Sequence, residues 1–144
     1  MRKAIIVLGR TIAVGVVLQA SFIAFAWFTV IKDTDDGKSF TGEDDLNAGH
    51  MLHSIGGLVI PLLAIVLMIL AAVAKLPGGV TKFAGYTLIA AILQVVLGIA
   101  SYSLAAIGFL HGINAFAVAG LGAATAMKAA RSPEASVQPA TAAV

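Results

Sequence analysis

The three histidines are the residues of this chain best suited to chemistry. His50, His53 and His111 are its only histidines, and each lies near the start of a long apolar stretch. Ionisable side chains within apolar spans are rare and costly, and by default they mark a functional site. The chain has no cysteine. This excludes disulfides, iron–sulfur clusters, thiolate zinc sites and covalent c-type haem attachment, so imidazole ligation is the chemistry to consider.

The spacing of the histidines favours one arrangement. His50 and His53 are three residues apart and share a helix face. His53 lies about one turn below the start of the second apolar stretch, and His111 is at a similar depth in the fourth. Two imidazoles at one depth on nonadjacent helices of a bundle can face each other, as bis-histidine haem ligation requires. We therefore predict a haem b site with His53 and His111 as axial ligands and His50 as the alternative ligand or a supporting group.

Other polar and small residues are candidates for the walls of this pocket. Gly57 lies one turn from His53 and leaves room for a flat group. Lys32 or Lys38 could meet the haem propionates at the membrane surface. We assign no residue a catalytic role. The remaining pocket candidates are Asn114, Ser101 and Tyr102.

Two alternatives to a haem site remain open. A helical His-x-x-His with a third imidazole could hold zinc or copper, with Asp44 or Asp45 adding an oxygen ligand. The histidines could instead be interfacial side chains without a ligand. In that case the chain would be a small non-haem subunit whose small-residue helix faces dock on a larger membrane complex.

The composition predicts the elements that position the histidines. The chain of 144 residues is 60% hydrophobic and 11% charged, which is too apolar for a soluble domain of this size. A membrane-spanning helix needs about 20 mostly apolar residues, so we predict an all-α integral membrane four-helix bundle. Its spans are residues 4–31, 49–74, 80–104 and 109–127, and the Ala-, Ser- and Pro-containing tail 131–144 is predicted to be disordered.

The distribution of charge predicts the topology. Lys and Arg cluster at both ends of the chain and around the second connection, whereas the first connection is acidic. The positive-inside rule then places both termini in the cytoplasm and the histidines near the outer face. We expect a multi-pass protein of a bacterial plasma membrane that does not bind nucleic acid. Since the cytoplasmic half has no histidine, we do not expect the chain alone to carry electrons across the bilayer.

The start of the chain has some features of a signal peptide. Arg2 and Lys3 precede an apolar stretch, and Ala24-Phe25-Ala26 resembles a cleavage site. The apolar stretch continues to Ile31, which is too long for a signal peptide. We therefore expect an uncleaved first span.

The histidine pattern resembles one four-helix half of heme A synthase. Each half of that family has a histidine near the outer start of its second and fourth helices. These match His53 in His53-Ser54-Ile55-Gly56-Gly57 and His111 in Leu110-His111-Gly112-Ile113-Asn114-Ala115. Leu93-Gln94-Val95-Val96-Leu97-Gly98 is similar to the family's Leu-Gln-x-x-Leu-Gly stretch. Small uncharacterised four-helix bacterial membrane proteins are similar too.

The resemblance covers most of the chain and implies the fold and a haem pocket. His50 stands where the family has a glutamate implicated in its chemistry, and Ser54 stands where it often has arginine. The second four-helix half of the family's architecture has no counterpart in this sequence. We expect the protein to serve in electron transfer, in haem handling or as an accessory of a respiratory complex. A homodimer of this chain would rebuild the eight-helix assembly of that family.

Overall fold

The protein is an all-helical bundle of four long helices. The computed structural model describes residues 1–42 and 46–133. Within these residues the helices are α1 (Arg2–Asp35), α2 (Ala48–Ala74), α3 (Val80–Ser103) and α4 (Ile107–Arg131). Each is long and apolar enough to cross a membrane. The prediction of an all-α, multi-pass membrane bundle is confirmed. Of the predicted tail 131–144, Arg131 is the last residue of α4, and residues 134–144 lie outside the described residues.

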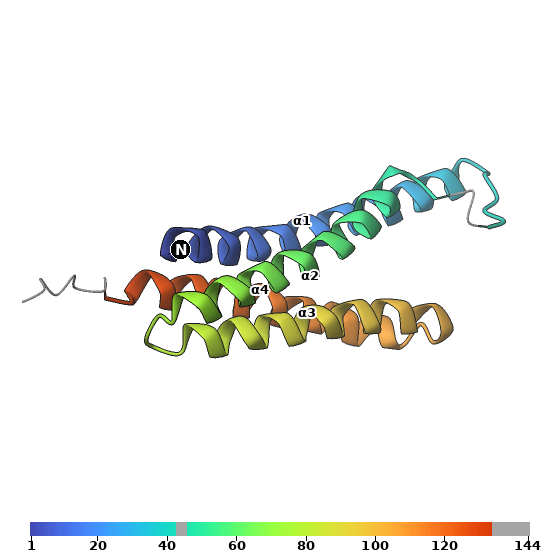
Figure 1. The fold of residues 1–144 in the computed structure, drawn as a ribbon. Coiled ribbons are helices and arrows are strands. Elements are labelled where there is room, and N and C mark those ends of the chain that lie inside the picture. Colours follow the sequence, from blue (N-terminus) through green and yellow to red (C-terminus); the bar gives the residue numbers. More distant parts are fainter. Residues whose placement is uncertain (43–45, 134–144) are drawn as a thin grey trace, which may run out of the picture.

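The helices form an up-and-down bundle in chain order (Figure 1). α1 packs against α2 and α4, and α3 packs against the same two helices. α2 and α4 are therefore diagonal partners across the interior. The start of α1 and the end of α4 lie at the same end of the bundle as the α2–α3 turn. We call this the basic end, because it has Arg2, Lys3, Lys75, Lys82, Lys128 and Arg131; the other end is the outer end.

The ends of the helices differ from the predicted spans by a few residues. α1 continues to Asp35, where the ammonium of Lys32 pairs with Asp36 one turn on. The predicted spans put Gly108 in the third turn, and this prediction is wrong. The chain turns at residues 104–106, and Gly108 lies inside α4, because hydrogen bonds from Ile107 N to Leu104 O and from Gly108 N to Ala105 O close the turn without a glycine.

The tightly packed part of the bundle is its basic half. Nearly all buried side chains among the described residues lie there, including Ile5, Ile12, Leu67, Val80 and Val118. α1 and α4 approach so closely that a Cβ on Gly9 would lie 2.6 Å from the Gly122 carbonyl oxygen. Small residues of this kind let membrane helices pack backbone against backbone.

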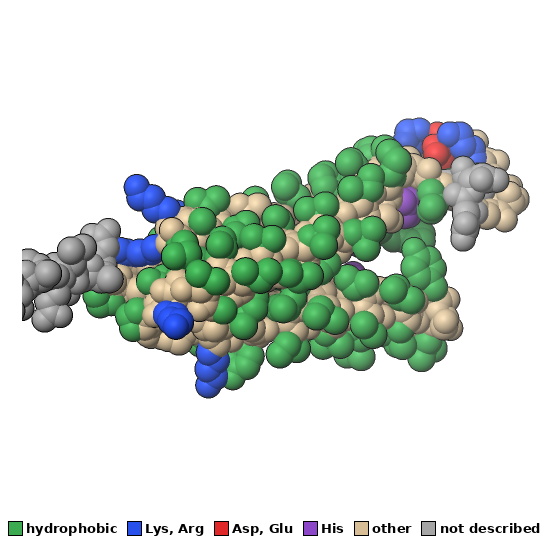
Figure 2. All heavy atoms as spheres, in the orientation of Figure 1, with side chains coloured by type: hydrophobic (Ala, Val, Ile, Leu, Met, Phe, Trp, Pro, Cys, Tyr) green, Lys and Arg blue, Asp and Glu red, His purple; other side chains and the backbone are tan. Residues whose placement is uncertain are grey.

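The outer half of the bundle is open. Beyond the basic half, the buried positions in the described part of the chain are Gly49 and Ala26, which hold α2 against α1. Figure 1 shows α1 and α2 leaning away from α3 and α4 toward the outer end, and Figure 2 shows a hollow between the two pairs there. Pro61 lies near the middle of α2. Because proline removes one helix hydrogen bond and bends a helix, we expect it to contribute to the lean of α2.

Candidate functional site

His53 and His111 meet across the interior of the bundle, where the packed half gives way to the hollow. The centroids of their rings are 6.1 Å apart and the ring planes are inclined at 64°. The two imidazoles thus come together edge to face from the nonadjacent helices α2 and α4. Bonds between a metal and an imidazole nitrogen are about 2 Å long. Two rings that ligate one metal from opposite sides therefore have centroids about 6 Å apart, which the observed separation matches.

Each of these imidazoles is oriented by a backbone carbonyl of the preceding helix. His53 Nδ1 lies 3.0 Å from the Gln19 carbonyl oxygen on α1, and His111 Nδ1 lies 3.0 Å from the Gln94 carbonyl oxygen on α3. A carbonyl oxygen can only accept, so each Nδ1 must carry the proton. In the neutral ring Nε2 then keeps its lone pair. Histidine ligands of metals are usually held in this way, with the second nitrogen donating to a carbonyl.

The Nε2 atom of His111 has a partner from the protein. The Gln94 side-chain amide lies 3.1 Å from it and donates to the lone pair. Asn114 orients that amide, since its Nδ2 donates to Gln94 Oε1 at 2.8 Å and to the Ala90 carbonyl oxygen at 2.9 Å. A ligand on His111 Nε2 must therefore displace the Gln94 amide.

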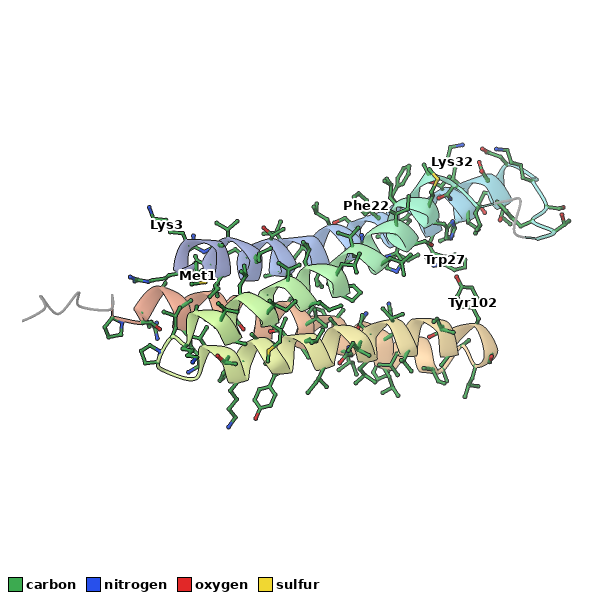
Figure 3. The ribbon with its side chains drawn as sticks, in the orientation of Figure 1. Met1, Lys3, Phe22, Trp27, Lys32 and Tyr102 are labelled. Atoms are coloured by element: carbon green, nitrogen blue, oxygen red, sulfur yellow. The ribbon has the colours of Figure 1, made fainter. Side chains whose placement is uncertain are left out.

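The other pocket candidates lie at different places around this pair. Asn114 acts on Gln94, and Ser101 donates to the Leu97 carbonyl oxygen within its own helix at 2.6 Å. Tyr102 is 92% exposed; in Figure 3 it projects from the end of α3 toward Trp27 of α1, at the mouth of the hollow. Gly57 faces open space, since no described atom would lie within 4 Å of a Cβ added there. The expected role of Gly57 in making room for a flat group stays a prediction.

His50 does not join the other two histidines. Its ring packs edge-on against Trp27, with ring centroids 5.7 Å apart, and its Nδ1 is buried without a hydrogen-bond partner among the described residues.

The charged residues expected at the site do not gather around the histidines. Lys32 and Lys38, expected near haem propionates, pair instead with Asp36 and Asp33. Within residues 1–42 and 46–133, no three His, Asp or Glu side chains form a group that could hold a metal ion. Asp44 and Asp45, the oxygen ligands considered for zinc or copper, lie outside these residues.

The two helical hairpins repeat each other. An offset of 75 residues carries the buried positions Ile5, Gly9 and Ile12 of α1 onto buried positions of α3, namely Val80, Ala84 and Thr87. An offset of 58 residues carries Ile60, Ala64, Leu67 and Ala71 of α2 onto buried positions of α4, namely Val118, Gly122, Thr125 and Ala129. The same offsets carry Gln19 onto Gln94 and His53 onto His111.

The repeat puts the histidine pair on an approximate two-fold axis. α1 and α3 run in one direction and α2 and α4 in the other, so the axis is parallel to the helices, as in parallel transporter repeats. Each hairpin contributes one imidazole held by one glutamine carbonyl. A site on such an axis presents the same group to both faces of a flat ligand.

The signal for this repeat is present in the sequence, although our predictions did not use it. Leu18-Gln19 recurs as Leu93-Gln94, and Leu52-His53-Ser54-Ile55 recurs as Leu110-His111-Gly112-Ile113. Gln94 entered those predictions as part of the Leu-Gln-x-x-Leu-Gly stretch and not as a partner of Gln19. The repeat identifies Gln19 and Gln94 as the residues whose carbonyl oxygens orient the two imidazoles.

Comparison of the chain with protein-family models, curated proteins and solved structures finds no match. The resemblance to heme A synthase therefore stays a prediction.

Proposed function

We propose that this protein binds one b-type haem between His53 and His111, near the outer end of the bundle. The observation that carries the proposal is the pair of imidazoles from diagonal helices, with centroids 6.1 Å apart. The carbonyl oxygens of Gln19 and Gln94 accept hydrogen bonds from Nδ1 of the two rings, so that Nε2 is the atom that would bind the iron, on His111 after displacement of the Gln94 amide.

The surroundings of the pair support a flat ligand in particular. The hollow between the two hairpins opens beside the histidines (Figure 2), and Gly57 leaves space on the His53 side. The approximate two-fold axis also supplies one equivalent ligand to each face of a planar group. A site for a compact ion such as zinc would instead need three or four side chains gathered on one point.

A haem held by two histidines supplies one-electron transfer. The residues of the chain would set its position and its access to solvent. The histidines lie in the outer half, and the basic half is filled by packed aliphatic side chains. The proposed role is therefore electron transfer at one membrane face, haem handling, or service to a respiratory complex at that face, rather than conduction across the bilayer.

The test is the visible spectrum of the purified protein, oxidised and dithionite-reduced. The wild type should show a reduced b-type α band, and both His53→Ala and His111→Ala should lose it. His50→Ala is the matched control, because His50 packs on Trp27 and not on the other rings. It should keep the band.

A colourless wild type, grown with ample haem and shown to be folded, would overturn the proposal. The chain would then be a non-haem subunit of a larger complex or would carry a different metal. Loss of the band in His50→Ala but not in His53→Ala would assign the axial ligand on α2 to His50, about one turn closer to the outer end.

A further inference from the structure

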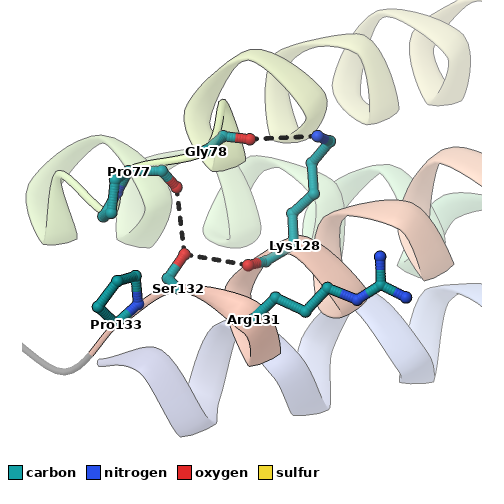
Figure 4. Close-up of a pocket in the computed structure, with 6 residues that line it drawn as sticks. All are labelled: Pro77, Gly78, Lys128, Arg131, Ser132 and Pro133. Atoms are coloured by element: carbon teal, nitrogen blue, oxygen red, sulfur yellow. Dashed lines mark hydrogen bonds between the residues drawn. The ribbon is translucent and has the colours of Figure 1, made fainter.

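A second site lies at the basic end of the bundle, far from the histidines. A pocket of about 220 Å³ opens between the α2–α3 turn and the end of α4. Figure 4 shows its lining: Pro77, Gly78, Lys128, Arg131, Ser132 and Pro133. We propose that this pocket binds the phosphate of an anionic glycerophospholipid.

The cations of the pocket are placed by the last turn of α4. Lys128 and Arg131 are three residues apart and share a helix face. The Lys128 ammonium is held 3.2 Å from the Gly78 carbonyl oxygen and 4.5 Å from the centroid of the Phe83 ring. An ammonium has three donors, so two remain for a ligand. Arg131 has no hydrogen bond or ion pair with any described residue, and its five donors suit phosphate oxygens.

The carbonyl oxygens that would repel an anion are already occupied. Ser132 Oγ lies 3.1 Å from the Pro77 oxygen and 3.0 Å from the Lys128 oxygen, and Gly78 accepts from Lys128 (Figure 4). The acidic side chains that the structure describes, Asp33, Asp35 and Asp36, are at the outer end. Among the described residues, the charged side chains at this end of the bundle are therefore all cations: Lys128 and Arg131 in the pocket, and Arg2, Lys3, Lys75 and Lys82 around it.

The position of the pocket selects a lipid over a soluble anion. It lies at the termini of three membrane-spanning helices, the depth at which phospholipid phosphates sit. Pro77 and Pro133 give it apolar walls beside the cations, which suits a phosphate attached to a glycerol backbone. Basic pockets between membrane helices recognise anionic head groups by this combination of charge and depth.

Native mass spectrometry of the full chain tests the proposal. The protein is exchanged into phosphatidylcholine nanodiscs doped with phosphatidylglycerol, and the lipid that stays bound after release is counted. The wild type should retain phosphatidylglycerol and little phosphatidylcholine. Arg131→Gln should lower the retained phosphatidylglycerol about tenfold, as expected for the loss of a charge-assisted hydrogen bond.

The matched control is Lys82→Gln, which removes one positive charge at the same end outside the pocket. The phosphatidylglycerol retained by this variant should fall no more than about threefold, because salt screens the attraction between a lipid phosphate and a charge that does not contact it. Arg131→Lys should recover most of the binding. Equal losses in Arg131→Gln and Lys82→Gln would overturn the proposal in favour of diffuse surface charge. Displacement of the lipid by millimolar inorganic phosphate would overturn it in favour of a free anion site.

Discussion

The two glutamines of the site occupy corresponding positions but use their side chains differently. Gln94 donates to His111 Nε2 and is oriented by Asn114. Gln19 donates instead to the Leu52 carbonyl oxygen, at 3.4 Å, and its Oε1 is buried without a described partner. The residue that corresponds to Asn114 is Gly56, which has no side chain to accept or donate. The chemistry at the histidines is therefore asymmetric although the fold is repeated.

Removing the Gln94 amide should strengthen ligation by His111. Gln94→Leu keeps the backbone carbonyl that holds Nδ1 and removes the donor that competes for Nε2. A neutral hydrogen bond contributes about 1 kcal/mol, so haem should bind about fivefold more tightly in a titration of the apoprotein. Gln19→Leu, which has no contact with His53 Nε2 to remove, should leave the affinity unchanged. Tighter binding in both variants, or weaker binding in Gln94→Leu, would contradict this role.

At the scale of the helices, one pair of glycines makes the bundle tighter on one side. The α1–α4 contact is built on Gly9 and Gly122, and the corresponding residues at the α2–α3 contact are Ala84 and Ala64. The two alanine side chains keep α2 and α3 further apart, so α2 packs less extensively on α3 than α1 does on α4. The hairpins are thus joined more firmly along α1 and α4.

Gly9→Ala should destabilise the bundle through this contact. Its Cβ would lie 2.6 Å from the Gly122 carbonyl oxygen, and backbone cannot move aside cheaply. Overpacking of this kind typically lowers the free energy of unfolding by about 1–3 kcal/mol, measurable by unfolding in mixed detergent micelles. Gly120→Ala, where no described atom lies within 4 Å of the new Cβ, should be neutral or stabilising by up to about 1 kcal/mol. Equal stability of the two variants would show that the α1–α4 contact is not close.

Pro61 is expected to contribute to the opening of the outer half, because proline bends helices. Pro61→Ala should restore a helix hydrogen bond, straighten α2 and narrow the hollow beside the histidines. Spin labels on cysteines at Met51 of α2 and Leu104 after α3 report this distance, and the chain has no native cysteine to interfere. We expect shorter label distances and weaker haem binding in Pro61→Ala. An unchanged distance would assign the opening to some feature other than this proline.

At the scale of the whole molecule, the distribution of charge predicts the orientation in the membrane. The positive-inside rule predicts that the basic end faces the cytoplasm. A cysteine in place of Lys38 should then react with a membrane-impermeant maleimide in intact spheroplasts, whereas one in place of Lys82 should react only after the membrane is permeabilised. The reverse pattern would place the histidine site on the cytoplasmic side.

The sequence by itself determined the class of fold and the outline of the site. The chain has four apolar stretches separated by polar or glycine-containing turns. In lipid, the backbone N–H and C=O groups of such a stretch need hydrogen-bond partners within the protein, and an α-helix supplies them within the stretch itself. Their length and direction also place His53 and His111 at one depth. These properties depend on composition and periodicity along the chain, which is why the pair could be predicted from one sequence.

The tertiary structure decided how those histidines are held and what lies beside them. The hydrogen bonds to the carbonyls of Gln19 and Gln94, the separation of His50 from the pair and the opening of the outer half depend on which helix faces are in contact. Contact between faces is set by the packing of small residues such as Gly9, Gly49 and Gly122, whose effect depends on the partner they meet. The pocket at the basic end likewise joins residues 77–78 to residues 128–133, and only the closed bundle brings those segments together.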